Sequence, residues 1–148
     1  MKVSSFRRDP RAMHDGEWIP AGPGWGEIEV KTRAMLPVYR DAVATRMARE
    51  ERKAGGADRV KSSVRDRVII DCLIDHCLLD VRGLEHENGD AVTFTEFCDM
   101  IRLEEYTELA GMCITATGQV GRERDEQLAD AVGNSPAASG IISPGAAK

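Results

Sequence analysis

The sequence predicts an α+β fold that is mainly α, with an N-terminal β-hairpin followed by three to four packed helices and a flexible arm at each end. Two short stretches, 17–19 and 28–32, alternate apolar and polar residues, and a turn-rich Pro-Gly segment separates them. From Leu36 onward the spacing of apolar residues becomes helical. Both ends of the chain are polar and show no period, which is typical of segments outside a core.

Length and composition favour one globular domain. The chain has 148 residues, of which 42% are hydrophobic, 30% charged and 5% aromatic. We expect a flexible basic arm at 1–15, a single domain at 16–120 and a Ser/Pro/Ala/Gly-rich tail at 121–148. No apolar stretch approaches the ~20 residues that span a bilayer, and no signal-like segment follows Met1, so we expect no membrane partner and a cytoplasmic location.

Charge is divided unevenly along the chain. Residues 1–65 carry a formal charge of +5 and residues 66–148 carry −10. Such a dipolar chain can place a basic and an acidic face on one domain, which favours self-association and charged partners. The alternative is two solvated faces of an ordinary domain. Nucleic-acid binding is disfavoured, because the chain is acidic overall and shows no reading motif or aromatic stacking cluster.

The hairpin and the first helix follow directly from these periods. Trp18 and Trp25 flank the turn, and we expect them to pack onto the helices. Helical spacing then places Tyr39, Val43 and Met47 on one apolar face, and Gly55-Gly56 ends this helix.

A second helix is predicted from about Arg59 to Val81, with Asp58 as its N-cap. Its apolar positions widen from one stripe to nearly the whole circumference, which indicates the most buried helix of the fold.

A tight turn and a third helix follow. The turn is centred on Asn88-Gly89, a pair that tolerates positive φ at both positions. Thr95 is the expected cap of the helix, and Phe97, Met100 and Ile101 are its apolar side. After a break near Leu103 the helical period resumes to about Val120.

Catalytic and metal-binding patterns are nearly absent. Cys72 and His76 are four residues apart and could supply two zinc ligands or a thiol–imidazole pair, but no second pair has a fixed spacing. We therefore predict no catalytic residue, no metal and no cofactor, and interpret Cys72, Cys77, Cys98 and Cys113 as reduced, buried thiols. The segment before Gly89 fails the calcium-loop pattern, and the Gly-rich turn at 22–26 lacks the Lys-Ser/Thr of a phosphate loop.

Several segments, taken in order, resemble the tail assembly chaperones of long-tailed bacteriophages and prophages. The resemblance covers about 16–120 and is sharpest at 78–97. It rests on a Gly-Glu-Trp hairpin ending in Glu29-Val30-Lys31-Thr32-Arg33, an Arg-rich helix, a long apolar segment running into Asp80-Val81-Arg82-Gly83-Leu84, then Glu87-Asn88-Gly89-Asp90, Val92-Thr93-Phe94-Thr95 and a final helix.

The resemblance implies a small, mostly helical protein that is not an enzyme. It would act in the host cytoplasm, bind the tape measure protein and keep it soluble while tail tube protein assembles around it. A chaperone for a long helical protein would use an apolar groove rimmed by charge, for which the candidates are Tyr39, Val43, Met47, Phe97, Met100 and Ile101.

Two other function classes stay open on the sequence. One is a structural virion component, such as a head–tail connector or tail-completion protein, that remains in the particle. The other is a small metal- or thiol-dependent enzyme, which would need a bound metal or a thiolate of low pKa.

Overall fold

The computed structural model describes residues 1–122. The tail expected at 121–148 therefore lies almost entirely outside the described residues. Two compact units divide the described chain: Pro10–Gly121, and a smaller unit that contains Met1–Asp9 with a 3-10 helix at Val3–Phe6. None of the described helices has the length and apolar character needed to cross a bilayer.

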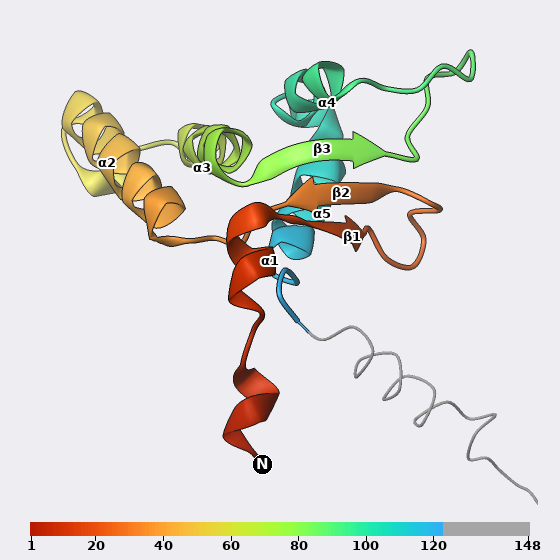
Figure 1. The fold of residues 1–148 in the computed structure, drawn as a ribbon. Helices are drawn as coiled ribbons and strands as arrows, with labels where there is room; N and C mark the ends of the chain where they lie inside the picture. Colours follow the sequence, from red (N-terminus) through yellow and green to blue (C-terminus); the bar gives the residue numbers. More distant parts are fainter. Residues whose placement is uncertain (123–148) are drawn as a thin grey trace, which may run out of the picture. The chain divides into compact units, whose positions relative to one another are not determined.

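A three-stranded antiparallel sheet and the helices around it make up the larger unit, which confirms the α+β, mainly α, prediction. The strands are β1 (Glu17–Pro20), β2 (Glu29–Thr32) and β3 (Leu78–Arg82), in the order β1-β2-β3. The helices are α1 (Pro10–Asp15), α2 (Pro37–Ala54), α3 (Ser62–His76), α4 (Phe94–Ile101) and α5 (Thr107–Thr117). Figure 1 shows α5 crossing behind the sheet and α2 beside α3.

The N-terminal hairpin forms as predicted, with Ile19 opposite Val30. Its two tryptophans differ in their surroundings. Trp25 packs against the main core, whereas the Trp18 ring lies under the guanidinium of Arg82, 4.1 Å from its centroid. This cation–π contact ties β1 to β3 across the central strand.

The expected second helix is wrong in its last part, because residues 78–82 form β3 instead. Helix α3 ends at His76, and Val81 pairs with Val30 of β2. Leu78 and Val81 are buried, while Asp80 and Arg82 are exposed. Apolar residues lie on both sides of Asp75-His76 at the boundary, and no Gly or Pro signals the change from helix to strand. The start also differs, since Asp58 lies in a 3-10 turn (Ala57–Arg59) and α3 begins at Ser62.

Residues 10–15 also differ from the expected flexible arm, because they form α1. Ala12 and Met13 pack against a small cluster of Ile19, Ala34, Ala116 and Val120. The backbone N–H of Ala34 donates to the carbonyl of Met13 at 3.0 Å. A six-residue helix is too short to show a period in the sequence.

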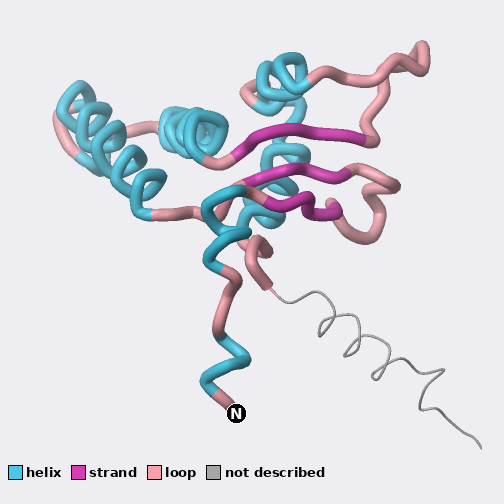
Figure 2. The backbone as a smooth tube through the Cα atoms, viewed as in Figure 1, coloured by secondary structure: helices cyan, strands magenta, loops and turns pink. Residues whose placement is uncertain are grey.

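The turn at Asn88-Gly89 is a three-residue hairpin loop with a bulge. The N–H of Gly89 donates to the His86 carbonyl at 2.9 Å, and the N–H of His86 donates to the Asp90 carbonyl at 2.8 Å. Gly89 has φ +90°, which is the glycine position of a type I turn followed by a bulge, so Asn88 and Gly89 are not the two central residues of the turn. The Asn88 side chain accepts from the N–H of Asp90. Figure 2 shows this loop projecting from the sheet between β3 and α4.

Helix α4 is capped by Thr93, two residues earlier than expected. Thr93 Oγ1 accepts from the N–H of Glu96 at 3.2 Å, and the Glu96 carboxylate accepts from the N–H of Thr93 at 2.8 Å. This capping box satisfies two donors of the first turn. The predicted break after α4 is confirmed, with a 3-10 helix, η3 (Glu104–Tyr106), before α5.

The core lies where β2 and β3 meet α3, α4 and α5. Phe97, Leu73 and Ile101 are among the largest fully buried side chains. A buried hydroxyl pair, Thr32 and Thr117, joins β2 to α5 with 3.2 Å between the oxygens. Each hydroxyl oxygen also lies within hydrogen-bond distance of a backbone carbonyl, that of Arg33 for Thr32 and that of Cys113 for Thr117. Since a hydroxyl has one proton, one hydroxyl donates to its carbonyl and the other to its partner's oxygen, and both are satisfied.

Gly83 should tolerate substitution far less than Gly89, although both have positive φ. A Cβ at Gly83 would lie 2.7 Å from the carbonyl carbon of Glu27, whereas a Cβ at Gly89 would meet nothing within 4 Å. We expect Gly89→Ala to cost about 1–2 kcal/mol of unfolding free energy, from its conformation alone. Gly83→Ala should cost about 3 kcal/mol or more, because backbone must also move. Denaturant unfolding measures both, and equal costs would contradict the close approach.

Glu96 should make stability depend on pH. Its hydrogen bonds with Thr93, and then its contact with His86, hold the pKa of this carboxyl below the ordinary value. A pKa that is lower in the folded than in the unfolded chain gives stabilisation that is complete above the unfolded pKa and lost as the pH falls through the folded one. Glu96→Gln keeps a capping-box residue but should flatten the fall of Tm below about pH 4.5. Glu87→Gln, in the neighbouring loop, is the control and should leave the slope unchanged.

Candidate binding surface

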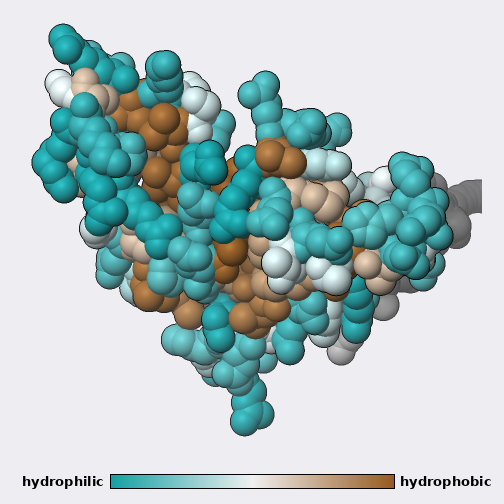
Figure 3. All heavy atoms as spheres, turned by 90° about the horizontal axis from the view of Figure 1, so that it is seen from above, coloured by the Kyte–Doolittle hydropathy of each residue, from teal (hydrophilic) through white to brown (hydrophobic). Residues whose placement is uncertain are grey.

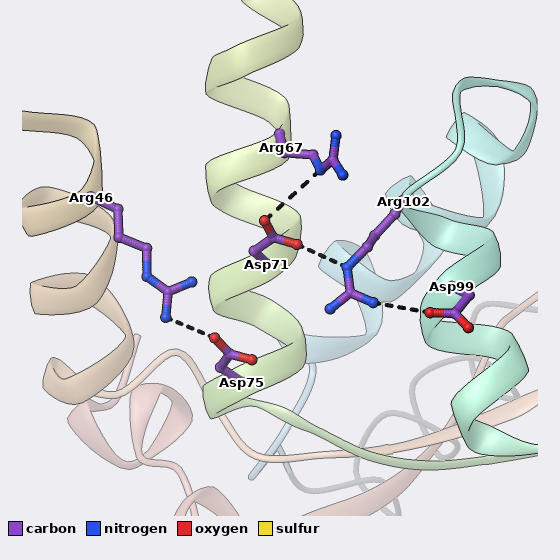
Figure 4. A network of polar contacts seen from close by, with 6 residues as sticks. All are labelled: Arg46, Arg67, Asp71, Asp75, Asp99 and Arg102. Carbon is purple, nitrogen blue, oxygen red and sulfur yellow. Dashed lines mark hydrogen bonds and ion pairs between the residues drawn. The ribbon is translucent and has the colours of Figure 1, made fainter. Parts of the chain in front are cut away.

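Two aspartates on α3 connect this helix to its neighbours on both sides. Asp75 accepts from Arg46 of α2 at 2.7 Å. Asp71, one turn earlier, accepts from Arg102 at the end of α4 at 2.9 Å and lies 3.9 Å from Arg67. Figure 4 shows Asp71 and Asp75 pointing in different directions from α3, each toward one arginine of another helix.

Arg102 and Asp71 each contact two partners in this network. Besides Asp71, Arg102 lies 3.3 Å from Asp99, and its hydrogen bond to Asp71 raises its pKa further above the ordinary value. These groups are partly exposed, so each pair contributes on the order of 1 kcal/mol or less. Their main consequence is positional, because they fix the distance between α3 and the α4–η3 segment.

A groove of about 390 Å³ opens between α3 and the α4–η3–α5 segment. Its apolar surface includes Leu103, 49% exposed, and Ile114, 38% exposed. Charged side chains stand at its edges. The lining residues are Ser63, Asp66, Arg67, Ile69 and Ile70 of α3, Ile101, Arg102, Leu103 and Glu104 of the connecting segment, and Thr107, Ala110, Gly111 and Ile114 of α5. We call this surface the α3–α5 groove.

Gly111 has no side chain, so it leaves space on the α5 side of this groove. It lies inside a helix, and a Cβ built on it would meet nothing within 4 Å. Glycine in a helix interior costs roughly 0.5–1 kcal/mol relative to alanine. Packing within the described residues therefore gives no reason for a glycine at this position.

The charges around the α3–α5 groove are of two kinds. Arg67 and Arg102 are paired with Asp71 and Asp99. In contrast, the carboxylates of Asp66 and Glu104 make no ion pair or side-chain hydrogen bond within residues 1–122. The unneutralised charge at the groove is therefore negative.

A second hollow of about 400 Å³ lies on the opposite side of α3, against α2. Arg46, Arg49 and Arg67 line it together with Glu50 and Asp71. Seen from above, hydrophobic residues lie between segments whose surfaces are hydrophilic (Figure 3). Ser63 and Arg67 line both hollows, so α3 forms a ridge between them.

The predicted binding residues do not form an exposed surface together. Phe97 and Ile101 are 0% and 1% exposed and belong to the main core, so the two do not form an exposed face of α4. Ile101 nevertheless lines the α3–α5 groove. Tyr39 is buried as well, with its pKa raised mainly by burial. Met47, Val43 and Met100 are half-buried against the same core. Tyr39, Val43 and Met47 are covered because α2 packs against α3. The α4 residues are covered because α4 packs on β3, a strand that was not predicted.

The cysteines and His76 differ in their exposure. Cys72 is fully buried in α3, and His76 is only half-buried. Burial raises the pKa of Cys77 and of Cys113 to about 12, and burial is also the main cause of the raised pKa of Cys72 and Cys98. Within the described part of the chain, no three His, Cys, Asp or Glu residues are grouped to hold a metal ion.

Apart from Ile101, the residues of the α3–α5 groove were not predicted from the sequence, although α5 carries a signal. After Glu108 the helix has no charged residue up to its end at Thr117. A helix that is apolar on all sides is either fully buried or has a second partner. Because Gly111 and Ile114 are exposed while Met112 and Cys113 are buried, the structure favours the second reading.

Residues 34–134 match the model of a family described as "YdaY prophage protein". The match covers more than half of the chain and includes α2, β3, α3, α4 and α5. No curated protein and no solved structure matches the chain.

The thiols should be inert while the protein is folded. A thiol reacts as its thiolate, and burial both hides these four sulfurs and disfavours their charged form. With Ellman's reagent at about pH 8 we expect no thiol to titrate in the native protein and all four to titrate in guanidinium. A single fast-reacting thiol in the native protein would show that one cysteine is activated, and Cys72→Ala and Cys98→Ala would identify it.

Proposed function

The chain belongs to the YdaY prophage protein family, and from this premise we propose that it is a tail assembly chaperone. It binds helices of the tape measure protein in the host cytoplasm and keeps that protein soluble while tail tube protein assembles around it. In this proposal it is not an enzyme and uses no cofactor.

The observation that carries the proposal is the α3–α5 groove, an open apolar channel with charged edges on a prophage protein. Amphipathic helices are recognised by such channels, in which apolar anchors one turn apart are buried and the rim supplies charge. A tape measure protein is long and helical. Before assembly its apolar helix faces would be exposed to water unless a partner binds them.

The segment that carries the resemblance to tail assembly chaperones also has a structural meaning that supports the proposal. Residues 78–97 comprise β3, the bulged loop around Gly89, and the capping box of α4. These features place α4 on the sheet and bring Arg102 to Asp71. The segment thus sets one wall of the α3–α5 groove.

Co-expression with the tape measure protein of the same prophage tests the proposal. We expect the soluble fraction of the tape measure protein to rise several-fold and the two proteins to co-purify. An unrelated small acidic protein expressed at the same level is the control. An unchanged soluble fraction, with both proteins abundant, would contradict the chaperone function.

The same system separates a chaperone from a virion component. A chaperone should be absent from purified, mature particles, whereas a connector or tail-completion protein remains at fixed stoichiometry. Immunoblotting of gradient-purified virions measures this, and a stoichiometric signal would favour the structural role.

A further inference from the structure

We propose that the α3–α5 groove seats a single amphipathic helix whose apolar stripe is flanked by Lys or Arg, with the closest approach of the two helices at Gly111. This inference rests on the proposed function and deepens it, because it names the surface, the contact point and the chemistry of the helix that is bound.

The dimensions of the groove fit two turns of a helix. Along α3 the lining residues run from Ser63 to Ile70, and along α5 from Thr107 to Ile114. Each run spans seven steps of 1.5 Å, or roughly 10 Å. Leu103 and Ile114 present exposed apolar side chains to this space, so a stripe with anchors at i, i+3 or i+4, and i+7 would remove them from water.

Gly111 marks the place where a second helix comes nearest. Small residues at helix contacts allow two backbones to approach closely, and Ala110 and Gly111 are the smallest residues of the groove. The destabilising glycine has no packing partner within the described residues that would require it. A bound helix whose backbone lies close to Gly111 would explain why this position is a glycine.

The carboxylates of the groove that are unpaired within residues 1–122 favour binding of a basic helix over an acidic one. Asp66 on α3 and Glu104 on η3 line the groove without a side-chain partner among residues 1–122, while its arginines are already paired. Lys or Arg beside the apolar stripe would pair with these carboxylates, and Glu or Asp would be repelled. Complementary charge thus sets the preference, and apolar burial supplies most of the affinity.

A pair of peptides tests the proposal with the full chain. Both are fluorescein-labelled helices of 18 residues with the same Leu/Ala stripe, and they carry either Lys or Glu at the flanking positions. Fluorescence anisotropy measures their binding to the wild-type protein. We expect the Lys peptide to bind at least about tenfold more tightly, with an affinity that falls as salt rises.

Three variants locate the site. Gly111→Leu fills the groove floor and should weaken binding of the Lys peptide at least about tenfold, while Tm stays the same or rises because leucine favours helix more than glycine. Thr115→Leu places the same leucine side chain at an exposed position of α5 that does not line the groove, and should bind as the wild type does. Asp66→Lys combined with Glu104→Lys should reverse the preference between the peptides.

The outcomes are separable from those of the proposed function. Equal affinity for both peptides, or wild-type binding by Gly111→Leu, overturns the groove assignment even if the tape measure protein is solubilised. Peptide discrimination that Gly111→Leu abolishes supports the groove even if the tape measure protein fails to bind, in which case the chaperone function is wrong. If sedimentation shows that wild-type copies self-associate, and Gly111→Leu abolishes this without affecting the peptides, the occupant is a second copy and the proposal is overturned.

Discussion

The pairing of β3 with β2 is the contact on which the rest of the larger unit depends. It joins residues about fifty positions apart, Val30 and Val81, and makes β2 a central strand with neighbours on both sides. Because α3 runs directly into β3, this pairing also fixes where α3 ends. Helix α2 then packs beside α3, and α4 follows from the other end of β3. The buried Thr32–Thr117 pair attaches α5 to the same central strand.

The position of α3 in turn determines the position of the α3–α5 groove. Its buried side enters the core through Val68, Cys72 and Leu73, and its outer side carries Asp71 and Asp75, which reach arginines of two other helices. Ion pairs at this exposure are too weak to hold the fold. Opposite them α5 lines the groove with Thr107, Ala110, Gly111 and Ile114, of which Ala110 and Gly111 are small. A groove remains because the small residues of α5 stop short of α3.

The described residues combine buried thiols with an open apolar groove. The cysteines lie where burial raises their pKa, and the described residues group no metal ligands. In the α3–α5 groove, apolar surface is exposed beside carboxylates that make no ion pair or side-chain hydrogen bond within residues 1–122. Under the proposed chaperone function, an open groove with complementary charge would allow helices to bind without permanent assembly.

Local patterns in the sequence identify the hairpin, α2, the break before α5 and the fold class, because each depends on periodicity or on a glycine within a few residues. Tertiary contacts decided the remainder. Leu78–Arg82 has the apolar content of a helix end, and becomes a strand because β2 offers an unpaired edge. Phe97 and Ile101 have the spacing of an exposed binding face, and become core because β3 and α5 cover them. Gly111 has no meaning in the sequence alone, since only the neighbouring helices show that the space beside it is open. Periodicity reports that a face is apolar, but whether the chain covers that face is settled by segments far away in the sequence.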